Sequence, residues 1–164
     1  MLNHADRYPL AADLEGKKVV IKFGGSSIEN TAELDRFCHD VKLLVSLGIK
    51  PVVVHGGGPE ISAEMKRRDL PIKKVLGLRV TDDNTLEVAK GVLARINDQI
   101  VRAMQRAGLR SMGLAGTECN TLVCRKMGPV KGKDASGAEI EADLGWVGEP
   151  IRAHARTLNR LTAD

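Results

Sequence analysis

The first clear hydrophobic pattern is a short β-branched run followed by a helical one. Residues 19–21, Val-Val-Ile, predict a buried strand. After a glycine loop, Asn30 offers an N-cap, with Glu33 three residues later, to a helix that ends near Gly48. The apolar positions of this helix are spaced by three or four residues: Leu34, Phe37, Val41, Leu44 and Val45.

The same pattern recurs immediately. Residues 51–54, Pro-Val-Val-Val, predict a second buried strand, and residues 55–58, His-Gly-Gly-Gly, form the loop after it. Pro59 suits the first turn of another helix. Because two consecutive strand-glycine-helix units require crossover connections, they predict a parallel sheet.

The remainder of the chain continues the mixture of helices and strands. Residues 81–83, Thr-Asp-Asp, open a long helix that runs to Gly108 and should cover one face of the sheet. Its apolar positions are Leu86, Ala89, Leu93, Ile96, Ile100 and Met104. Further on, the pattern predicts strands at residues 111–115, 121–127 and 143–151, a surface hairpin loop at 128–137 and a final helix at 152–161.

These elements predict one α/β domain over residues 1–164, with a layered, parallel-rich sheet flanked by helices. The chain has no linker and no internal repeat beyond the two strand-glycine-helix units. It has no apolar run near the roughly 20 residues of a membrane span, and its N-terminus lacks a signal-peptide core, so we expect a cytoplasmic location.

Composition excludes some functions. Aromatic residues make up 2% of the chain, which disfavours modules that stack nucleic-acid bases. The net charge of +4 comes from scattered basic residues, so it indicates anionic ligands only weakly and no nucleic-acid partner. The three cysteines form no CxxC pair, and no histidine lies at a zinc-ligand spacing from them, so no metal site is expected.

The two glycine loops suit anion binding. A glycine turn between a strand and a helix lets the backbone approach a ligand and directs N–H groups at an anion. Lys22 precedes its glycines, which excludes a P-loop, and the loop at residues 55–59 is not the GxGxxG of dinucleotide-binding folds. The alternative is that each loop is only a tight strand-to-helix turn.

Three side chains near these loops are candidates for function. Lys22 directly follows a β-branched run, so it should emerge at the carboxyl end of a parallel strand, where open sheets bind ligands. His55 could act as a base or could orient its loop through a backbone hydrogen bond. Arg79 could bind a carboxylate through two hydrogen bonds from its guanidinium group, and the alternative is a salt bridge to Asp82 or Asp83.

Four segments together resemble the amino-acid kinase family, and within it the acetylglutamate kinases. They read VIKFGG at residues 20–25, VVHGGGP at 53–59, GLRVTD at 77–82 and DLGWVGE at 143–149. Their order and spacing agree with the family as well, and the resemblance runs from about Gly16 to Pro150. It implies the carbamate kinase-like α/β fold.

The resemblance also implies an activity. Such kinases transfer the γ-phosphoryl group of ATP, bound with Mg²⁺, directly to the side-chain carboxylate of N-acetyl-L-glutamate in arginine biosynthesis. Lys22 would be the catalytic residue that neutralises charge on the moving phosphoryl group. By the same resemblance, Gly24 and Gly25 would contact ATP phosphates, the Gly57 and Gly58 amides would bind the accepting carboxylate, and Arg79 would bind the α-carboxylate.

The resemblance leaves alternatives open. Family members continue into an asparagine-containing strand, an aspartate, a second lysine and a nucleotide-binding lobe, none of which is in this sequence, so we expect a truncated form. The alternatives are a non-catalytic amino-acid-binding, regulatory or dimerisation module, and a kinase for acetylaminoadipate or aspartate. We expect a homodimer through this part of the fold or pairing with a full-length kinase, and no membrane or nucleic-acid partner.

Overall fold

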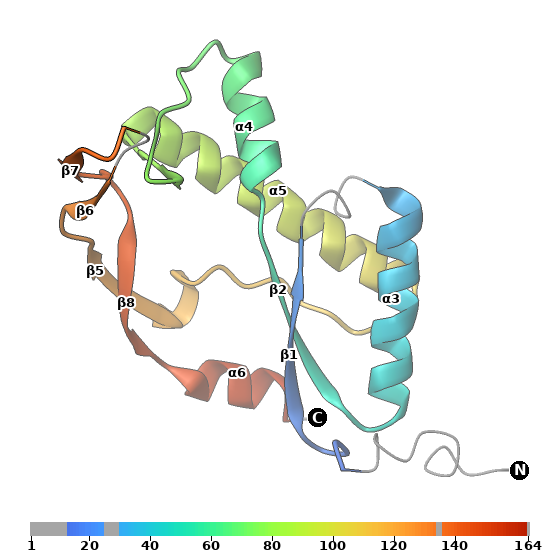
Figure 1. Ribbon diagram of the computed structural model, residues 1–164. Helices are drawn as coiled ribbons and strands as arrows, with labels where there is room; N and C mark the ends of the chain where they lie inside the picture. The colour runs from blue at the N-terminus through green and yellow to red at the C-terminus, as the bar shows by residue number, and fades with distance from the viewer. Residues whose placement is uncertain (1–12, 25–29, 134–135, 164) are drawn as a thin grey trace, which may run out of the picture. The chain divides into compact units, whose positions relative to one another are not determined.

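The structure is a computed structural model that describes residues 13–24, 30–133 and 136–163 (Figure 1). Contacts divide the chain into two compact units, each described by itself below. The first unit comprises residues 1–57, 95–114 and 160–164, and the second comprises residues 58–94 and 115–159. Of the described helices, none is both long enough and apolar enough to span a bilayer.

The first unit contains the predicted parallel strands. β1 (Lys18–Phe23) and β2 (Lys50–His55) pair in parallel, in a register that runs from Lys18 opposite Lys50 to Phe23 opposite His55. Helix α3 (Thr31–Ser46) connects them, as expected for a strand-glycine-helix unit. The parallel pairing predicted from the repeated pattern is therefore confirmed.

Helix α3 begins and packs as its sequence predicts. The Asn30 side-chain oxygen accepts hydrogen bonds from the backbone N–H groups of Ala32 (3.0 Å) and Glu33 (3.3 Å), which satisfies donors left open at a helix start. One face of the helix buries Leu34, Cys38 and Val41. The Phe37 ring stacks on Phe23 of β1 with a centroid separation of 4.1 Å, so this face of α3 packs against the strands.

The opposite face of the β1–β2 pair is only partly covered in the described part of the chain, and here the expectation of two buried strands was wrong. Val20 is 70% exposed and Val54 is 50% exposed. The register places Val20 opposite Val52 and Lys22 opposite Val54, so all four side chains lie on one face. We call Val20, Val52 and Val54 the valine face. A short apolar run predicts a strand without specifying how many of its faces are covered.

The second unit contains helix α4 (Gly58–Arg67) and three antiparallel pairs. The pairs join β3 (Lys74–Val75) to β4 (Leu78–Arg79), β5 (Leu122–Lys126) to β8 (Gly148–Ala153), and β6 (Val130–Lys133) to β7 (Glu139–Ala142). A 3₁₀ turn, η2 (Glu118–Asn120), precedes β5, and helix α6 (Ala155–Leu161) follows β8, with its last two residues in the first unit.

Several expectations for this part needed correction. Residues 111–115 form no strand, and the strand expected from residue 143 begins at Gly148. The segment expected to be a loop at residues 128–137 contains strand β6. Its half-buried positions, Val130 and Gly132, alternate with exposed lysines and pair with Ala142 and Ile140 of β7. Because lysine and glycine are not typical strand residues, the two-residue periodicity of this strand was not recognised in the sequence. The predictions of a strand within residues 121–127 and of a final helix are confirmed.

Helix α5 (Asp83–Arg106) is the longest element, with residues 83–94 in the second unit and 95–106 in the first. Its buried apolar positions are Val88, Val92, Ile96, Ile100, Ala103 and Met104. The expected positions from Ile96 onward are confirmed, whereas Val88 and Val92 take the place of Ala89 and Leu93 nearer the start. Both sets have helical spacing, so periodicity alone could not choose between them.

A short bridge fixes the start of α5 against the chain near β8. The Thr81 N–H donates to the Leu144 carbonyl oxygen, and the Trp146 N–H donates to the Thr81 carbonyl oxygen, both at 2.7 Å. Between these bonds, Gly145 has a φ of +74°, which side-chain-bearing residues rarely adopt. A Cβ atom on Gly145 would overlap the Thr81 carbonyl oxygen.

We therefore expect Gly145→Ala to lower the free energy of unfolding by about 2–4 kcal/mol, because backbone strain and overlap act together. Gly137→Ala is the matched control, since Gly137 also has a positive φ (+86°) but no atom of the described residues lies within 4 Å of its added Cβ. The control should cost about 1 kcal/mol. Chemical denaturation of both variants measures the difference, and equal losses would exclude the close Thr81 contact.

Candidate functional site

The carboxyl ends of β1 and β2 lie side by side. Phe23 and His55, the last residues of the two strands, are partners in the parallel register. The Gly56 N–H donates to the Phe23 carbonyl oxygen at 3.3 Å, and a Cβ atom on Gly24 would lie 3.6 Å from the Gly56 nitrogen. The two glycine loops therefore start next to each other, at the sheet edge where α/β folds bind ligands.

Lys22 stands just before this edge. It is exposed and lies opposite Val54, and its side chain has no hydrogen bond or ion pair in the described part of the chain. Its ammonium group is thus available to an anion. Gly25, the other predicted phosphate-binding glycine of this loop, lies outside the described residues.

His55 is used within its own loop. Its Nδ1 atom lies 2.9 Å from the Gly56 carbonyl oxygen, a distance at which an Nδ1–H would donate to that carbonyl. Of the two roles considered for His55, this geometry supports the orientation of the loop. The second glycine loop then continues through Gly57, which is buried, to Gly58, the first residue of α4.

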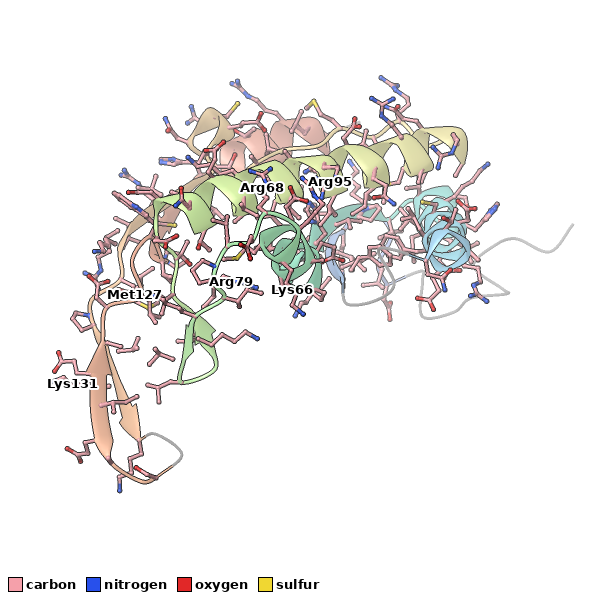
Figure 2. The ribbon with its side chains drawn as sticks, turned by 90° about the horizontal axis from the view of Figure 1, so that it is seen from above. Lys66, Arg68, Arg79, Arg95, Met127 and Lys131 are labelled. Atoms are coloured by element: carbon pink, nitrogen blue, oxygen red, sulfur yellow. The ribbon has the colours of Figure 1, made fainter. Side chains whose placement is uncertain are left out.

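Arg79 is fastened to the first turns of α4. From β4, its Nη2 atom donates to the Ser62 hydroxyl oxygen at 2.7 Å and to the Gly58 carbonyl oxygen at 3.2 Å, and its Nη1 atom contacts the Met65 sulfur at 3.3 Å. Figure 2 shows the position of Arg79 in the chain. The structure thus brings two predicted substrate-binding residues, Arg79 and Gly58, into direct contact.

The salt-bridge alternative for Arg79 is not what the structure shows. Asp82 instead accepts a hydrogen bond from the Thr85 N–H at 2.8 Å, which lowers the pKa of its carboxyl and caps α5. Asp83 accepts from the indole N–H of Trp146. Arg79 therefore faces α4 without a carboxylate partner among the described residues.

The sequence did not reveal the α4 side chains that hold Arg79. Ser62 and Met65 lie four and seven residues after Gly58, and this spacing places all three on one face of the helix. This helical spacing could be read from the sequence. It did not identify the partners of Arg79, because nothing in the sequence indicated that Arg79 packs on this face of α4.

The other side of α4 carries two glutamates. Glu64 accepts hydrogen bonds from Arg67 and Arg68, and these bonds lower the pKa of its carboxyl to about 2. Glu60, in the first turn, is 8% exposed, and neither of its carboxylate oxygens has a hydrogen-bond partner in the described chain. Glu60 was also not singled out from the sequence.

Comparison with known proteins places these features in a family. The model of the amino acid kinase family matches residues 17–163, a range that includes both glycine loops, Lys22 and Arg79. The chain belongs to the amino acid kinase family. The α/β class expected from the sequence, with a parallel strand pair and flanking helices, is thereby confirmed as the fold of this family.

Relatives within the amino acid kinase family agree with the resemblance. The chain is 45% identical over 142 residues to an acetylglutamate kinase of Methanospirillum hungatei, an alignment that covers 86% of this chain and 48% of that protein. It is 42% identical over 156 residues to an acetylglutamate kinase of Methanothermobacter thermautotrophicus, covering 94% of this chain and 53% of that protein. The chain thus spans about half the length of the curated relatives it matches.

A solved structure supports the fold. The chain resembles an N-acetylglutamate synthase of Neisseria gonorrhoeae, complexed with coenzyme A and N-acetyl-glutamate, with a TM-score of 0.74. That similarity has 20% sequence identity and covers 94% of this chain and 33% of the synthase chain. At this identity it establishes only that the two share a fold.

The depressed pKa of Glu64 predicts an acid-dependent contribution to stability. A carboxyl whose pKa is lower in the folded state stabilises the fold above its unfolded value of 4.5, and this contribution disappears as the pH falls toward about 2. In Glu64→Gln, the free energy of unfolding should therefore be lower at pH 7 and should decline less steeply between pH 4.5 and 2.

Urea denaturation at successive pH values measures this difference. Glu87→Gln is the control, since Glu87 on α5 has no ion pair with another described residue and its replacement should leave the wild-type slope nearly unchanged. A Glu64→Gln chain whose acid slope equals that of wild type would contradict the stabilisation by Arg67 and Arg68.

Proposed function

We propose that this chain provides the amino-acid-binding part of an acetylglutamate kinase. The reaction would transfer the γ-phosphoryl group of ATP to the side-chain carboxylate of N-acetyl-L-glutamate. The observation that supports this most is the juxtaposition of the two glycine loops at the ends of β1 and β2, with the unpaired Lys22 beside them. The similarity to acetylglutamate kinases supports the choice of substrate.

Phosphoryl transfer of this kind depends on position and charge. Two anions that repel each other must be held in line, and negative charge on the equatorial oxygens of the moving group must be neutralised. Lys22 would supply a positive charge to these oxygens, and the Gly24 and Gly25 amides would contact phosphate oxygens. Mg²⁺ would enter with ATP, as part of the co-substrate.

The acceptor would be held by the second loop and by Arg79. Backbone N–H groups of Gly57 and Gly58 would bind the side-chain carboxylate, favoured by the positive end of the α4 dipole. Arg79, fixed to the same first turns of α4, would bind the α-carboxylate. Glu60 lies in this turn as well, and neither of its buried carboxylate oxygens has a hydrogen-bond partner among the described residues.

Catalysis would also need a nucleotide-binding part, which we assign to the half of the relatives' length that this chain does not span. The valine face supports this assignment, because parallel strands are normally covered on both faces. An amino-acid-binding or regulatory module without catalysis is the alternative. Dimerisation of this chain, or its pairing with a full-length kinase, stays a prediction.

Substrate binding is tested by Arg79→Ala. Loss of the guanidinium should weaken the binding of N-acetyl-L-glutamate at least about tenfold, because a charge-assisted hydrogen bond to the α-carboxylate is removed. Isothermal titration of the chain in the absence of ATP measures this. Arg102→Ala is the control, since Arg102 is exposed on α5 and paired with Asp98, and its affinity should equal that of wild type.

A titration panel with aspartate and N-acetyl-L-aminoadipate would identify the acceptor class. Tighter binding of either compound than of N-acetyl-L-glutamate would replace the proposed substrate. Absence of N-acetyl-L-glutamate binding to the folded chain, with Arg79→Ala indistinguishable from wild type, would refute the binding site itself.

Catalysis is tested by Lys22→Ala. The chain would be combined with the portion of the Methanospirillum hungatei relative that it does not span, produced as a separate polypeptide, and turnover followed by a coupled ATP-consumption assay. Lys22→Ala should reduce turnover about 100-fold or more, because a charge on the transferring group is lost. Lys18→Ala, an exposed position on the same face of β1, should retain wild-type turnover.

Two outcomes would separate the alternatives. Binding of N-acetyl-L-glutamate without any turnover in the combined assay would favour the non-catalytic module. Turnover that survives Lys22→Ala unchanged would show that another group neutralises the phosphoryl charge.

A further inference from the structure

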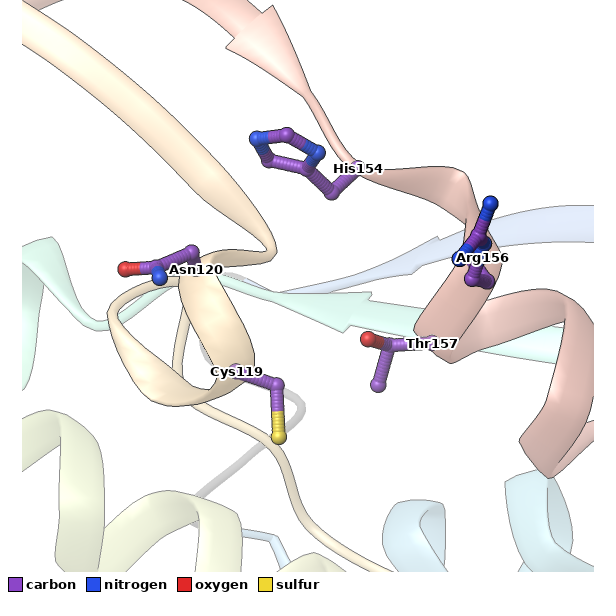
Figure 3. A pocket seen from close by; sticks show the side chains of 5 residues that line it. All are labelled: Cys119, Asn120, His154, Arg156 and Thr157. Carbon is purple, nitrogen blue, oxygen red and sulfur yellow. The ribbon is translucent and has the colours of Figure 1, made fainter.

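The second unit contains an open hollow beside η2 and the start of α6, which Figure 3 shows. Most of its lining side chains are exposed, and they point in different directions rather than toward a common centre. The hollow is therefore a depression of the surface without converging polar groups. Its lining residues are Cys119, Asn120, His154, Arg156 and Thr157.

The β3–β4 hairpin, which carries Arg79, has an unusual residue at its tip. Its strands have two residues each, and Val75 pairs with Leu78, so Leu76 and Gly77 form a two-residue turn. Both turn residues have a positive φ, +52° for Leu76 and +76° for Gly77, as a type I′ turn requires. Glycine suits this turn, whereas leucine is disfavoured at a positive φ. The leucine at the tip therefore points to a contact made by its side chain.

The Leu76 side chain lies against Gly132 of strand β6. A Cβ atom on Gly132 would come within 2.7 Å of Leu76 Cδ1 and 2.9 Å of Leu76 Cδ2, and a glycine inside a strand often marks such a close approach. Gly132 shares one face of the β6–β7 hairpin with three half-buried apolar residues, so Leu76 packs on the less exposed face of that hairpin. Figure 2 shows the two hairpins next to each other. The three apolar residues are Val130, Ile140 and Ala142.

The β3–β4 hairpin is also held at its base. The Val80 N–H donates to the Lys73 carbonyl oxygen at 3.0 Å, which closes the hairpin. The next residue, Thr81, donates through its N–H to the carbonyl oxygen of Leu144, which is 1% exposed. Arg79 lies between this base and the tip, so both contacts fix the strand from which its guanidinium reaches α4.

We propose that the contact between Leu76 and Gly132 positions Arg79 for the acceptor substrate. This inference rests on the proposed function, in which Arg79 binds the α-carboxylate. Leu76 and Gly132 are then positioning residues that do not touch the substrate themselves. Their contact holds the two-residue strand β4 in the place from which the guanidinium reaches the ligand. Loss of the contact weakens acceptor binding although every group that binds the acceptor is retained.

Leu76→Asn separates the side-chain contact from the stability of the turn. Asn-Gly is a favoured sequence for a type I′ turn, so this variant improves the turn while it removes the apolar contact. Binding of N-acetyl-L-glutamate should weaken at least about fivefold in isothermal titration. If Leu76 served only the turn, the affinity would be unchanged or higher, and that result would overturn the proposal.

Gly132→Ala tests the other partner of the contact. Its methyl group should displace Leu76 and weaken binding about threefold or more. In the Leu76→Asn background the same change should have little further effect, because the displaced side chain is gone, and additive losses would contradict the contact. Gly128→Ala is the matched control and should bind as wild type does, since Gly128 has no positive φ and no atom of the described residues lies within 4 Å of its added Cβ.

Hydrogen exchange distinguishes failure of this contact from failure of the proposed function. The Val80 N–H, bonded to Lys73 at the base of the hairpin, should exchange at least about fivefold faster in Leu76→Asn than in wild type. Unchanged exchange would overturn the role of the tip contact, whatever the chain binds. Faster exchange in Leu76→Asn, when the wild-type chain binds no N-acetyl-L-glutamate, would refute the proposed function and support the contact as an anchor of the hairpin.

Discussion

The register between β1 and β2 is the constraint on which the candidate site depends. Because the two strands are parallel and end together at Phe23 and His55, the segments that follow them must start side by side. The approach between Gly24 and Gly56 is close, because a Cβ atom on Gly24 would be in van der Waals contact with the Gly56 nitrogen. A shift of one residue in this register would turn Lys22 to the face that α3 covers and would separate the loops.

In the second unit, side-chain hydrogen bonds to the first turns of α4 position Arg79. Arg79 comes from a two-residue strand, an element with little stability of its own, and its position is defined by its bonds to Gly58 and Ser62. Both N–H groups of Nη2 are used in these bonds. A ligand carboxylate that binds the guanidinium through two hydrogen bonds must therefore replace at least one of the bonds to α4. If Arg79 binds the substrate as proposed, the substrate affinity would reflect the difference between the free energy of the ligand contact and that of the contact with α4.

The sequence predicted what local rules determine. The Asn30 cap, the parallel units and the final helix follow from spacing and residue type within a few turns of chain. Three features could not be predicted in this way: the exposure of Val20, strand β6 and the partners of Arg79. They depend on contacts between segments that are distant in the sequence, and local patterns do not indicate these contacts. The motif residues could be located from the sequence, whereas the roles of Lys22, Gly24, Gly25, Gly57, Gly58 and Arg79 remain predictions.

At the valine face, self-association of the chain would compete with the pairing proposed for the missing half. Val20 and Val54, two β-branched side chains on adjacent parallel strands, leave apolar surface exposed to other molecules, including a second copy of the same chain. Any homodimer that buries this surface would block the half of a kinase that we expect to pack there. Raising the concentration of the chain would then lower the yield of a completed enzyme, so self-association and assembly would oppose each other by mass action.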